Sequence, residues 1–336
     1  MELATSYLGL RLRNPIVASA SPLSSSVDGV RRLVDAGVGA VVLHSLFEEQ
    51  LREEAERNAR FTEAGTESFA ESLTYFPADA DEDPGPRRYL SLLERAAAAV
   101  DVPVIGSLNG VTPGGWGSYA GAMQEAGAAA IELNVYHVPG SPKISGRDVE
   151  QQLVDVVTGV KDAVGVPVAV KLSPYFSSTA EMAVRLDDAG ADGLVLFNRF
   201  LQPDVDPESL TVVPAVGLSH PSEALLPRTW IALLRGRVRA SLAASTGVED
   251  PDDVARFLLA GADVVMTASA LLRHGPDYAT VLIDGLSDWM ARKDFTTLDQ
   301  VRGLLAVTPG TDEVARERAG YVSGLREANN HVYGPW

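Results

Sequence analysis

The 336-residue sequence contains no cysteine. This absence excludes disulfide bonds, thiolate metal sites, an iron–sulfur cluster held by this chain, and a cysteine acting as nucleophile or base. Histidine is also scarce. The five histidines are scattered without the spacing of metal ligands, so the sequence predicts no metal site.

Long hydrophobic runs and a basic leader are missing as well. No stretch of about 18 apolar residues is free of charge, so we expect no membrane span. The N-terminus reads Met-Glu-Leu-Ala and lacks the basic and apolar regions of a signal peptide, which predicts a cytoplasmic protein. Acidic residues outnumber basic ones, and the net charge of −17 disfavours nucleic acid as a partner.

A short pattern of residues recurs four times along the sequence. A helical stretch ends in Ala-Gly, a short turn follows, and an apolar strand comes next. Glycine ends a helix in the left-handed conformation at no steric cost, and a strand that is apolar throughout is typical of a buried parallel sheet. The glycines of the four repeats are Gly37, Gly127, Gly190 and Gly261.

The repeats predict an α/β protein with eight parallel strands. The expected strands lie near residues 16–20, 40–45, 103–108, 130–135, 167–173, 193–198, 240–245 and 264–269. Amphipathic helices are expected between them. Regular alternation favours a closed (β/α)8 TIM barrel, with a doubly wound open sheet as the alternative. A short hairpin between Leu3 and Arg13 is expected to close the bottom of the barrel.

Three segments depart from the repeat. Residues 47–84 are long, polar and acidic, and residues 200–221 are rich in proline and histidine. Both are predicted to be loop insertions on the catalytic face of a barrel domain that spans residues 1–295. Residues 296–336 are predicted to form a C-terminal tail that packs on the barrel or on a partner subunit.

Polar residues stand at the end of every predicted strand, where a (β/α)8 barrel carries its active site. The most informative is Lys171, which interrupts an otherwise apolar strand. A buried ammonium group needs an anionic partner. Three partners are open: the N1–C2 edge of a reduced flavin, a salt bridge to Glu132, or a substrate carbonyl in a Schiff base.

Small residues follow the last two predicted strands. They read Ser245-Thr246-Gly247-Val248 and Thr267-Ala268-Ser269-Ala270. Barrels often bind phosphate with the loops after strands seven and eight, because small residues let backbone N–H groups approach it. The sequence therefore predicts a phosphate site here.

Together with residues 14–20, 131–134 and 170–176, these segments resemble the dihydroorotate dehydrogenase family from the first strand to the eighth helix. The resemblance implies an FMN-dependent oxidoreductase acting on CH–CH groups, a cytoplasmic flavoprotein of the kind used in pyrimidine biosynthesis. It implies hydride transfer between a small anionic substrate and flavin N5, with dihydroorotate as one candidate. It also implies a homodimer that passes electrons to a soluble acceptor or a redox partner protein.

The resemblance assigns roles by position. Lys171 is expected to face the N1–C2 edge of the flavin. The residues expected to bind the cofactor are Ala18, Ser19, His44, Ser45, Asn109, Asn134, Lys171, Asn198, Thr246, Gly247, Ala268 and Ser269. Substrate is expected to contact Asn134, Asn198 and Arg199, with the guanidinium group of Arg199 clamping a carboxylate.

The chain departs from the family after the fourth strand. The family usually carries Asn-Leu-Ser-Cys-Pro-Asn there, with Cys or Ser as the catalytic base, whereas this sequence reads Asn-Val-Tyr-His-Val from Asn134. His137 is the predicted replacement, since an ordinary pKa near ~6.5 suits proton abstraction at neutral pH. Tyr136 is the rival. The predicted catalytic residues are therefore His137, Tyr136 and Lys171.

Two other functions are compatible with the sequence. The missing base also fits a catalytically silent flavin-binding protein with a regulatory or scaffold role. The phosphate site alone also fits a flavin-free barrel lyase or synthase that acts on a phosphorylated substrate.

Overall fold

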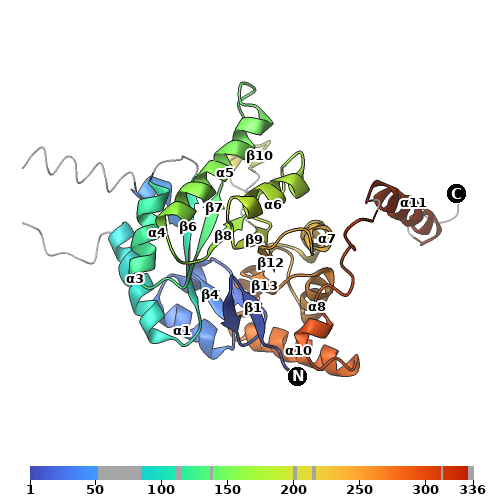
Figure 1. Cartoon of the computed structure of the whole chain (residues 1–336), viewed down its shortest axis with the longest axis horizontal. Helices are drawn as coiled ribbons and strands as arrows, with labels where there is room; N and C mark the ends of the chain where they lie inside the picture. Colours follow the sequence, from blue (N-terminus) through green and yellow to red (C-terminus); the bar gives the residue numbers. More distant parts are fainter. Residues whose placement is uncertain are drawn as a thin grey trace, which may run out of the picture.

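The structure, a computed structural model, describes residues 1–51, 85–110, 115–136, 139–199, 203–213, 217–311 and 313–331. Eight parallel strands form its centre (Figure 1). They are β3 (Ile16–Ala18), β4 (Ala40–Val42), β6 (Val104–Gly110), β7 (Ala130–Val135), β8 (Val168–Lys171), β9 (Gly193–Leu196), β12 (Ser241–Ala244) and β13 (Val264–Thr267). Because β13 pairs with β3 and β4 pairs with β6, the sheet closes on itself. The predicted barrel is confirmed, and the open sheet is wrong.

Helices surround the barrel and return the chain to the start of the next strand (Figure 1). They are α1 (Val27–Asp35), α3 (Pro86–Ala99), α4 (Trp116–Glu125), α5 (Gly146–Ala163), α6 (Thr179–Asp188), α7 (Leu225–Leu234), α8 (Pro251–Ala260) and α10 (Tyr278–Arg292). Shorter elements are β5 (Leu46–Phe47), η1 (Pro22–Ser24), η2 (Pro221–Ala224), α9 (Ser269–His274) and η3 (Leu298–Gln300).

Local sequence fixes where several helices begin and end. The Ser26 hydroxyl accepts a hydrogen bond from the Gly29 N–H and starts α1, and Ser145 forms a capping box that starts α5. The repeated glycines after α1, α4, α6 and α8 all have positive φ, between 91° and 122°. The Ala-Gly phrase is therefore a helix stop, as the sequence predicts.

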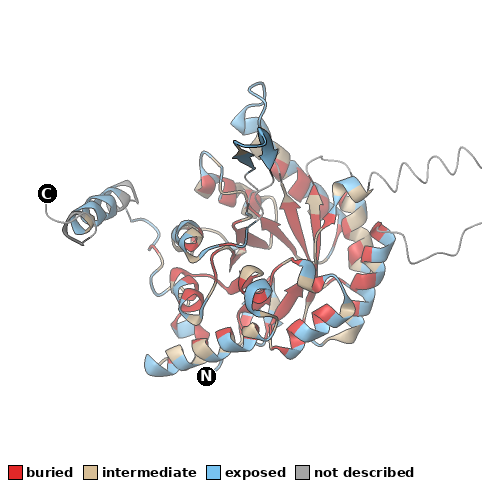
Figure 2. Ribbon diagram, turned by 180° about the vertical axis from the view of Figure 1, so that it is seen from behind, coloured by how far each residue is buried: buried red, intermediate tan, exposed pale blue. Residues whose placement is uncertain are grey.

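Burial separates two layers of core (Figure 2). One layer lies between the strands and the helices. The other fills the lumen of the barrel and includes the N-terminal hairpin of β1 (Thr5–Tyr7) and β2 (Leu10–Leu12). Leu8, in the hairpin turn, donates its N–H to Ser241 Oγ at 3.1 Å, and its side chain lies so close to Gly193 that a Cβ there would be 2.5 Å from Leu8 Cδ2. The hairpin closes the amino-terminal end of the barrel, as predicted.

The two predicted insertions and the tail are described in part. Residues 52–84, 200–202 and 214–216 lie outside the described residues. Between them, β10 (Asp204–Asp206) and β11 (Thr211–Val213) form an antiparallel hairpin. Residues 303–307 run along α7 and α8 through backbone hydrogen bonds, and α11 (Glu313–His331) stands clear of the barrel in Figure 1. In the described part of the chain, no helix is long and apolar enough to cross a membrane.

Candidate functional site

The interior of the barrel changes from apolar to polar along its strands. Its lower levels hold apolar side chains such as Val17 on β3 and Ala169 on β8. Two residues further along the same strands come Ser19 and Lys171, which are both buried. Because all eight strands are parallel, their carboxyl ends meet at one rim, and the polar side chains gather there.

Lys171 ends β8 and occupies the centre of this group. Its side chain is 8% exposed, and its Nζ donates a hydrogen bond to Ser19 Oγ at 3.3 Å. The nearest carboxylate is that of Glu132 on β7, with Oε1 3.7 Å from Nζ. An ammonium group has three donors. The described residues accept from one of them within hydrogen-bonding distance, so a ligand beside Lys171 would find donors to spare.

Two asparagines flank the lysine on the neighbouring strands. Asn134 lies opposite Lys171 in the register of β7 and β8, and Asn198 follows β9. The Asn198 amide donates to Asn134 Oδ1 at 2.6 Å. Asn109 lies opposite Asn134 on β6 and is half-buried. The predicted asparagines are therefore brought together with Lys171 on the part of the rim formed by β6 to β9.

The loops after β12 and β13 form the other side. Thr246 and Gly247 both have positive φ, at 81° and 73°. A Cβ on Gly247 would be 2.5 Å from the backbone N of Ala224, so only glycine fits this turn. The Gly247 N–H donates to Ser219 Oγ at 3.2 Å, and that hydroxyl lies 2.9 Å from Ser269 Oγ.

A cavity of about 190 Å³ connects these groups. Its lining includes seven of the predicted site residues: Ser19, Lys171, Asn198, Arg199, Thr246, Ala268 and Ser269. Arg199 is exposed at its rim, where Nε donates to Glu223 Oε1 at 3.0 Å and Nη1 donates to the carbonyl of Gly217. Arg199 is thus tied to the loop that carries Ser219.

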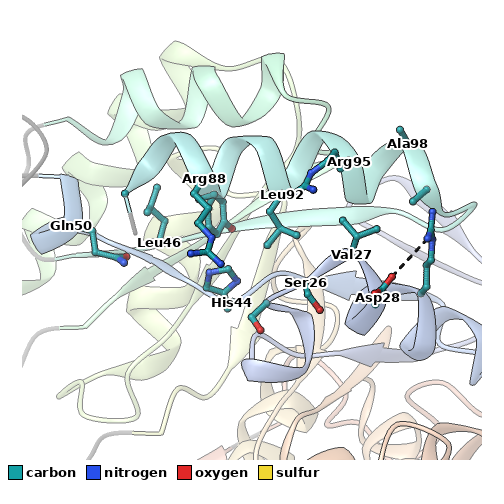
Figure 3. A pocket seen from close by; sticks show the side chains of 15 residues that line it. Ser26, Val27, Asp28, His44, Leu46, Gln50, Arg88, Leu92, Arg95 and Ala98 are labelled. Carbon is teal, nitrogen blue, oxygen red and sulfur yellow. Dashed lines mark ion pairs between the residues drawn. The ribbon is translucent and has the colours of Figure 1, made fainter. Parts of the chain in front are cut away.

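His44 and Ser45 are adjacent in sequence, but their side chains lie in different surroundings. Ser45 Oγ lies 2.9 Å from Ser107 Oγ inside the barrel. The His44 ring instead packs against Tyr89 of α3, with ring centroids 5.2 Å apart. It lines a separate cavity of about 890 Å³ between α1 and α3, together with Arg88 (Figure 3). Among the described residues, the structure does not bring His44 together with Lys171.

Burial lowers the pKa of His44, and the charge of Arg88 adds to this effect, while a backbone hydrogen bond to Ser24 opposes it. His44 is therefore a neutral ring at neutral pH. This state suits its packing position on the outer side of the strands.

The remaining predicted residues lie around the rim. Ala18 ends β3, but its side chain belongs to the layer between strands and helices, so it can offer only its backbone to a ligand in the barrel. Tyr136 directly follows β7, is half-buried, and donates its backbone N–H to Gly110 O at 3.2 Å. His137 lies outside the described residues.

Sequence reasoning missed Ser219 as part of this group. It lies in the predicted insertion, and nothing in the local sequence distinguishes it from neighbouring loop residues. Glu132 did carry a signal, because it is a charged residue in an apolar strand, as Lys171 is. Its carboxylate is 1% exposed, and neither oxygen has a hydrogen-bond partner among the described residues.

Comparison with known proteins identifies the family to which this chain belongs. The family model for dihydroorotate dehydrogenase matches residues 2–290. The chain belongs to the dihydroorotate dehydrogenase family. Enzymes of this family are flavoproteins, and the chain is accordingly an oxidoreductase of this type.

Individual relatives of this dihydroorotate dehydrogenase family member have low sequence identity, but the matches cover 90% of this chain. The chain is 29% identical over 310 residues to the catalytic subunit of dihydroorotate dehydrogenase B (NAD(+)) from Methanothermobacter thermautotrophicus, covering 90% of this chain and 98% of the relative. The corresponding subunit from Methanocella arvoryzae is also 29% identical, with the same coverage. The PreA subunit of the NAD-dependent dihydropyrimidine dehydrogenase of Escherichia coli K12 is 24% identical over 90% of this chain and 76% of the relative.

Proposed function

We propose that this protein binds FMN at the carboxyl ends of the strands and uses it to oxidise or reduce a CH–CH bond of a small anionic molecule. The observation that carries the proposal is Lys171, a buried ammonium with unused donors on the wall of a cavity that leads to the loops after β12 and β13. Such an ammonium suits the N1–C2 edge of a flavin, where negative charge collects on reduction.

The phosphate of FMN would be held by the loops after β12 and β13. The hydroxyls of Ser219 and Ser269 lie 2.9 Å apart in this region, and each can turn to donate to a phosphate oxygen. The chain turns in the left-handed conformation at Thr246 and Gly247, and the missing side chain of Gly247 lets the backbone approach a phosphate closely. These residues fit a phosphate group because they combine hydroxyl donors with close backbone approach.

When bound, the flavin supplies a two-electron acceptor that takes hydride at N5. The chain must then handle the partner proton. Tyr136, which directly follows β7, and His137, the next residue, are the candidates. Tyr136 comes two residues after Asn134, which lies opposite Lys171. A base at Tyr136 would therefore stand at the same rim as Lys171.

The proposed substrate is a small anion built on a cyclic amide or imide. Asn134 and Asn198 present amide groups 2.6 Å apart, which suit the alternating donors and acceptors of such a ring. Arg199 stands at the rim with a guanidinium group that can exchange Glu223 for a substrate carboxylate. Dihydroorotate fits this description, whereas 5,6-dihydrouracil has the same ring without the carboxylate and is uncharged.

Electrons would leave to a soluble acceptor or to a redox partner protein. Two of the relatives above are named catalytic subunits, and a third is named as one subunit of a dehydrogenase. These 336 residues contain no cysteine, so an iron–sulfur cluster in the electron path would be held outside them. A homodimer, with α11 of the C-terminal tail on the partner subunit, completes the proposed assembly.

The test is an anaerobic half-reaction. The FMN-loaded protein is mixed with dihydroorotate or with 5,6-dihydrouracil, and flavin absorbance is followed. Bleaching by dihydroorotate alone supports an anionic substrate and a carboxylate-binding role for Arg199, whereas bleaching by 5,6-dihydrouracil supports the flavin oxidoreductase but contradicts the need for an anionic substrate. Bound FMN that neither these compounds nor a wider set of dihydropyrimidines and dicarboxylates reduces would favour a silent flavin-binding protein instead.

The same assay assigns the base. Tyr136→Phe and His137→Gln are compared with Tyr321→Phe, a control on the exposed face of α11. Loss of the base is expected to slow reduction by about 10²–10⁴-fold, as is usual for general-base catalysis. Wild-type rates in both site variants would remove this segment from the chemistry.

A further inference from the structure

Glu132 is a buried carboxylate with an unusual lack of contacts. It lies on β7 with its side chain in the barrel and is 1% exposed. Neither carboxylate oxygen accepts a hydrogen bond from any described residue. Burying an ionised carboxylate without hydrogen bonds is costly, so a charged partner must compensate for it.

The groups around Glu132 leave Lys171 as that partner. Ser107 and Ala169 lie beside Glu132 in the register of the neighbouring strands, and both are uncharged. From the hairpin below comes Tyr7, a neutral phenol, because burial first and the charge of Glu132 second raise its pKa. The ion pair with Lys171 Nζ, at 3.7 Å, is the contact that supplies positive charge.

The geometry of this pair differs from a closed salt bridge. The distance of 3.7 Å exceeds that of a hydrogen bond, and Lys171 directs its bond to Ser19 instead. The ammonium group therefore faces the cavity while Glu132 stays beneath it. Glu132 acts on Lys171 through its electric field, which is strong because both side chains are buried.

We propose that Glu132 is a positioning residue for the flavin: its carboxylate, 3.7 Å from Lys171 Nζ, offsets part of the ammonium charge and so lowers the reduction potential of the bound flavin. This inference rests on the proposed function, because it requires a flavin beside Lys171. It adds a charged residue to Lys171 and Arg199 in the site, one that touches neither the cofactor nor the substrate.

The direction of the effect follows from the charges. Reduction places negative charge on the flavin, and a carboxylate nearby opposes it. Glu132→Gln removes that opposition, so the flavin becomes easier to reduce. The midpoint potential of the variant should therefore lie above that of the wild type.

The experiment measures the midpoint potential of the FMN-loaded protein by dye equilibration between pH 6 and pH 9. Glu132→Gln is compared with wild type and with Tyr7→Phe, which removes a hydroxyl without a hydrogen-bond partner from the same buried region and leaves the charge unchanged. At pH 6, Glu132→Gln should favour the reduced flavin by at least tenfold, or about 30 mV for a two-electron couple. Tyr7→Phe should match the wild type.

Equal potentials for Glu132→Gln and wild type at every pH, with full flavin content in both, would overturn the inference and leave the proposed function standing. A wild-type chain that takes up no FMN would overturn both. If Glu132→Gln does not fold, Lys171→Met is compared with the double variant Lys171→Met/Glu132→Gln. The double variant should have the higher potential, and identical potentials would again refute the role of Glu132.

Discussion

Replacing Lys171 by methionine should destabilise the protein through Glu132, even when no flavin is present. The variant keeps an unbranched side chain, one heavy atom shorter, but removes the ammonium group that lies 3.7 Å from the Glu132 carboxylate. Two charges about 4 Å apart interact by roughly 4 kcal/mol at an effective dielectric constant of ~20. Breaking a buried pair by removing one partner costs a similar ~3–5 kcal/mol. We therefore expect Lys171→Met to lower the free energy of unfolding by about 4 kcal/mol.

The double variant Lys171→Met/Glu132→Gln separates this effect from lost packing. With both charges gone, no ion is buried without a partner, so most of the loss should be recovered. The assay is urea unfolding of the flavin-free proteins at pH 7, arranged as a double-mutant cycle. A coupling energy of about 3 kcal/mol or more is expected. Additive effects of the two substitutions would refute the view that Lys171 compensates Glu132.

Two further predictions concern the loops after β12 and β13. Gly247→Ala should weaken FMN binding at least tenfold in a fluorescence titration, because a Cβ would meet the backbone of Ala224 at 2.5 Å and φ is positive; unchanged affinity would show that this turn does not hold the phosphate. Burial raises the pKa of Glu249, but hydrogen bonds from His274 and Arg273 outweigh it and leave the pKa lowered. The stabilisation is therefore present above the ordinary pKa of about 4.3 and is lost as the pH falls through the folded value. Glu249→Gln should cost about 1 kcal/mol at pH 7, a modest amount for a partly exposed pair, and nothing at pH values below that window, as measured by urea unfolding; a pH-independent cost would contradict the role of its charge.

The barrel could be predicted because its helices and strands are marked by patterns of residues that are close in sequence. A glycine that stops a helix and an apolar strand that follows it are adjacent in sequence, and four such pairs set the period of the fold. Closure then requires only that successive strands pair. The hairpin beneath the barrel was predictable for the same reason, since its two strands are neighbours in the chain.

The site residues likewise fall into those that follow from local sequence and those that depend on contacts between distant parts of the chain. Lys171 and Ser19 were predictable because parallel strands deliver their ends to one rim, whatever the loops do. His44 departs from this rule: β4 ends at Val42, and the His44 ring packs against Tyr89 of α3, a contact between distant parts of the chain. Ser219 escaped prediction because it reaches the site from an inserted loop.

If the cavity beside Lys171 holds the flavin and the loops after β12 and β13 hold its phosphate, FMN must bind more tightly than riboflavin, which lacks the phosphate. The flavin-free protein is titrated with each compound and flavin fluorescence is followed. We expect saturable, stoichiometric binding of FMN and at least tenfold weaker binding of riboflavin, since each charge-assisted hydrogen bond to the phosphate is worth about 1.5–3 kcal/mol. A folded protein that binds neither compound, or binds both equally, would refute this placement of the flavin.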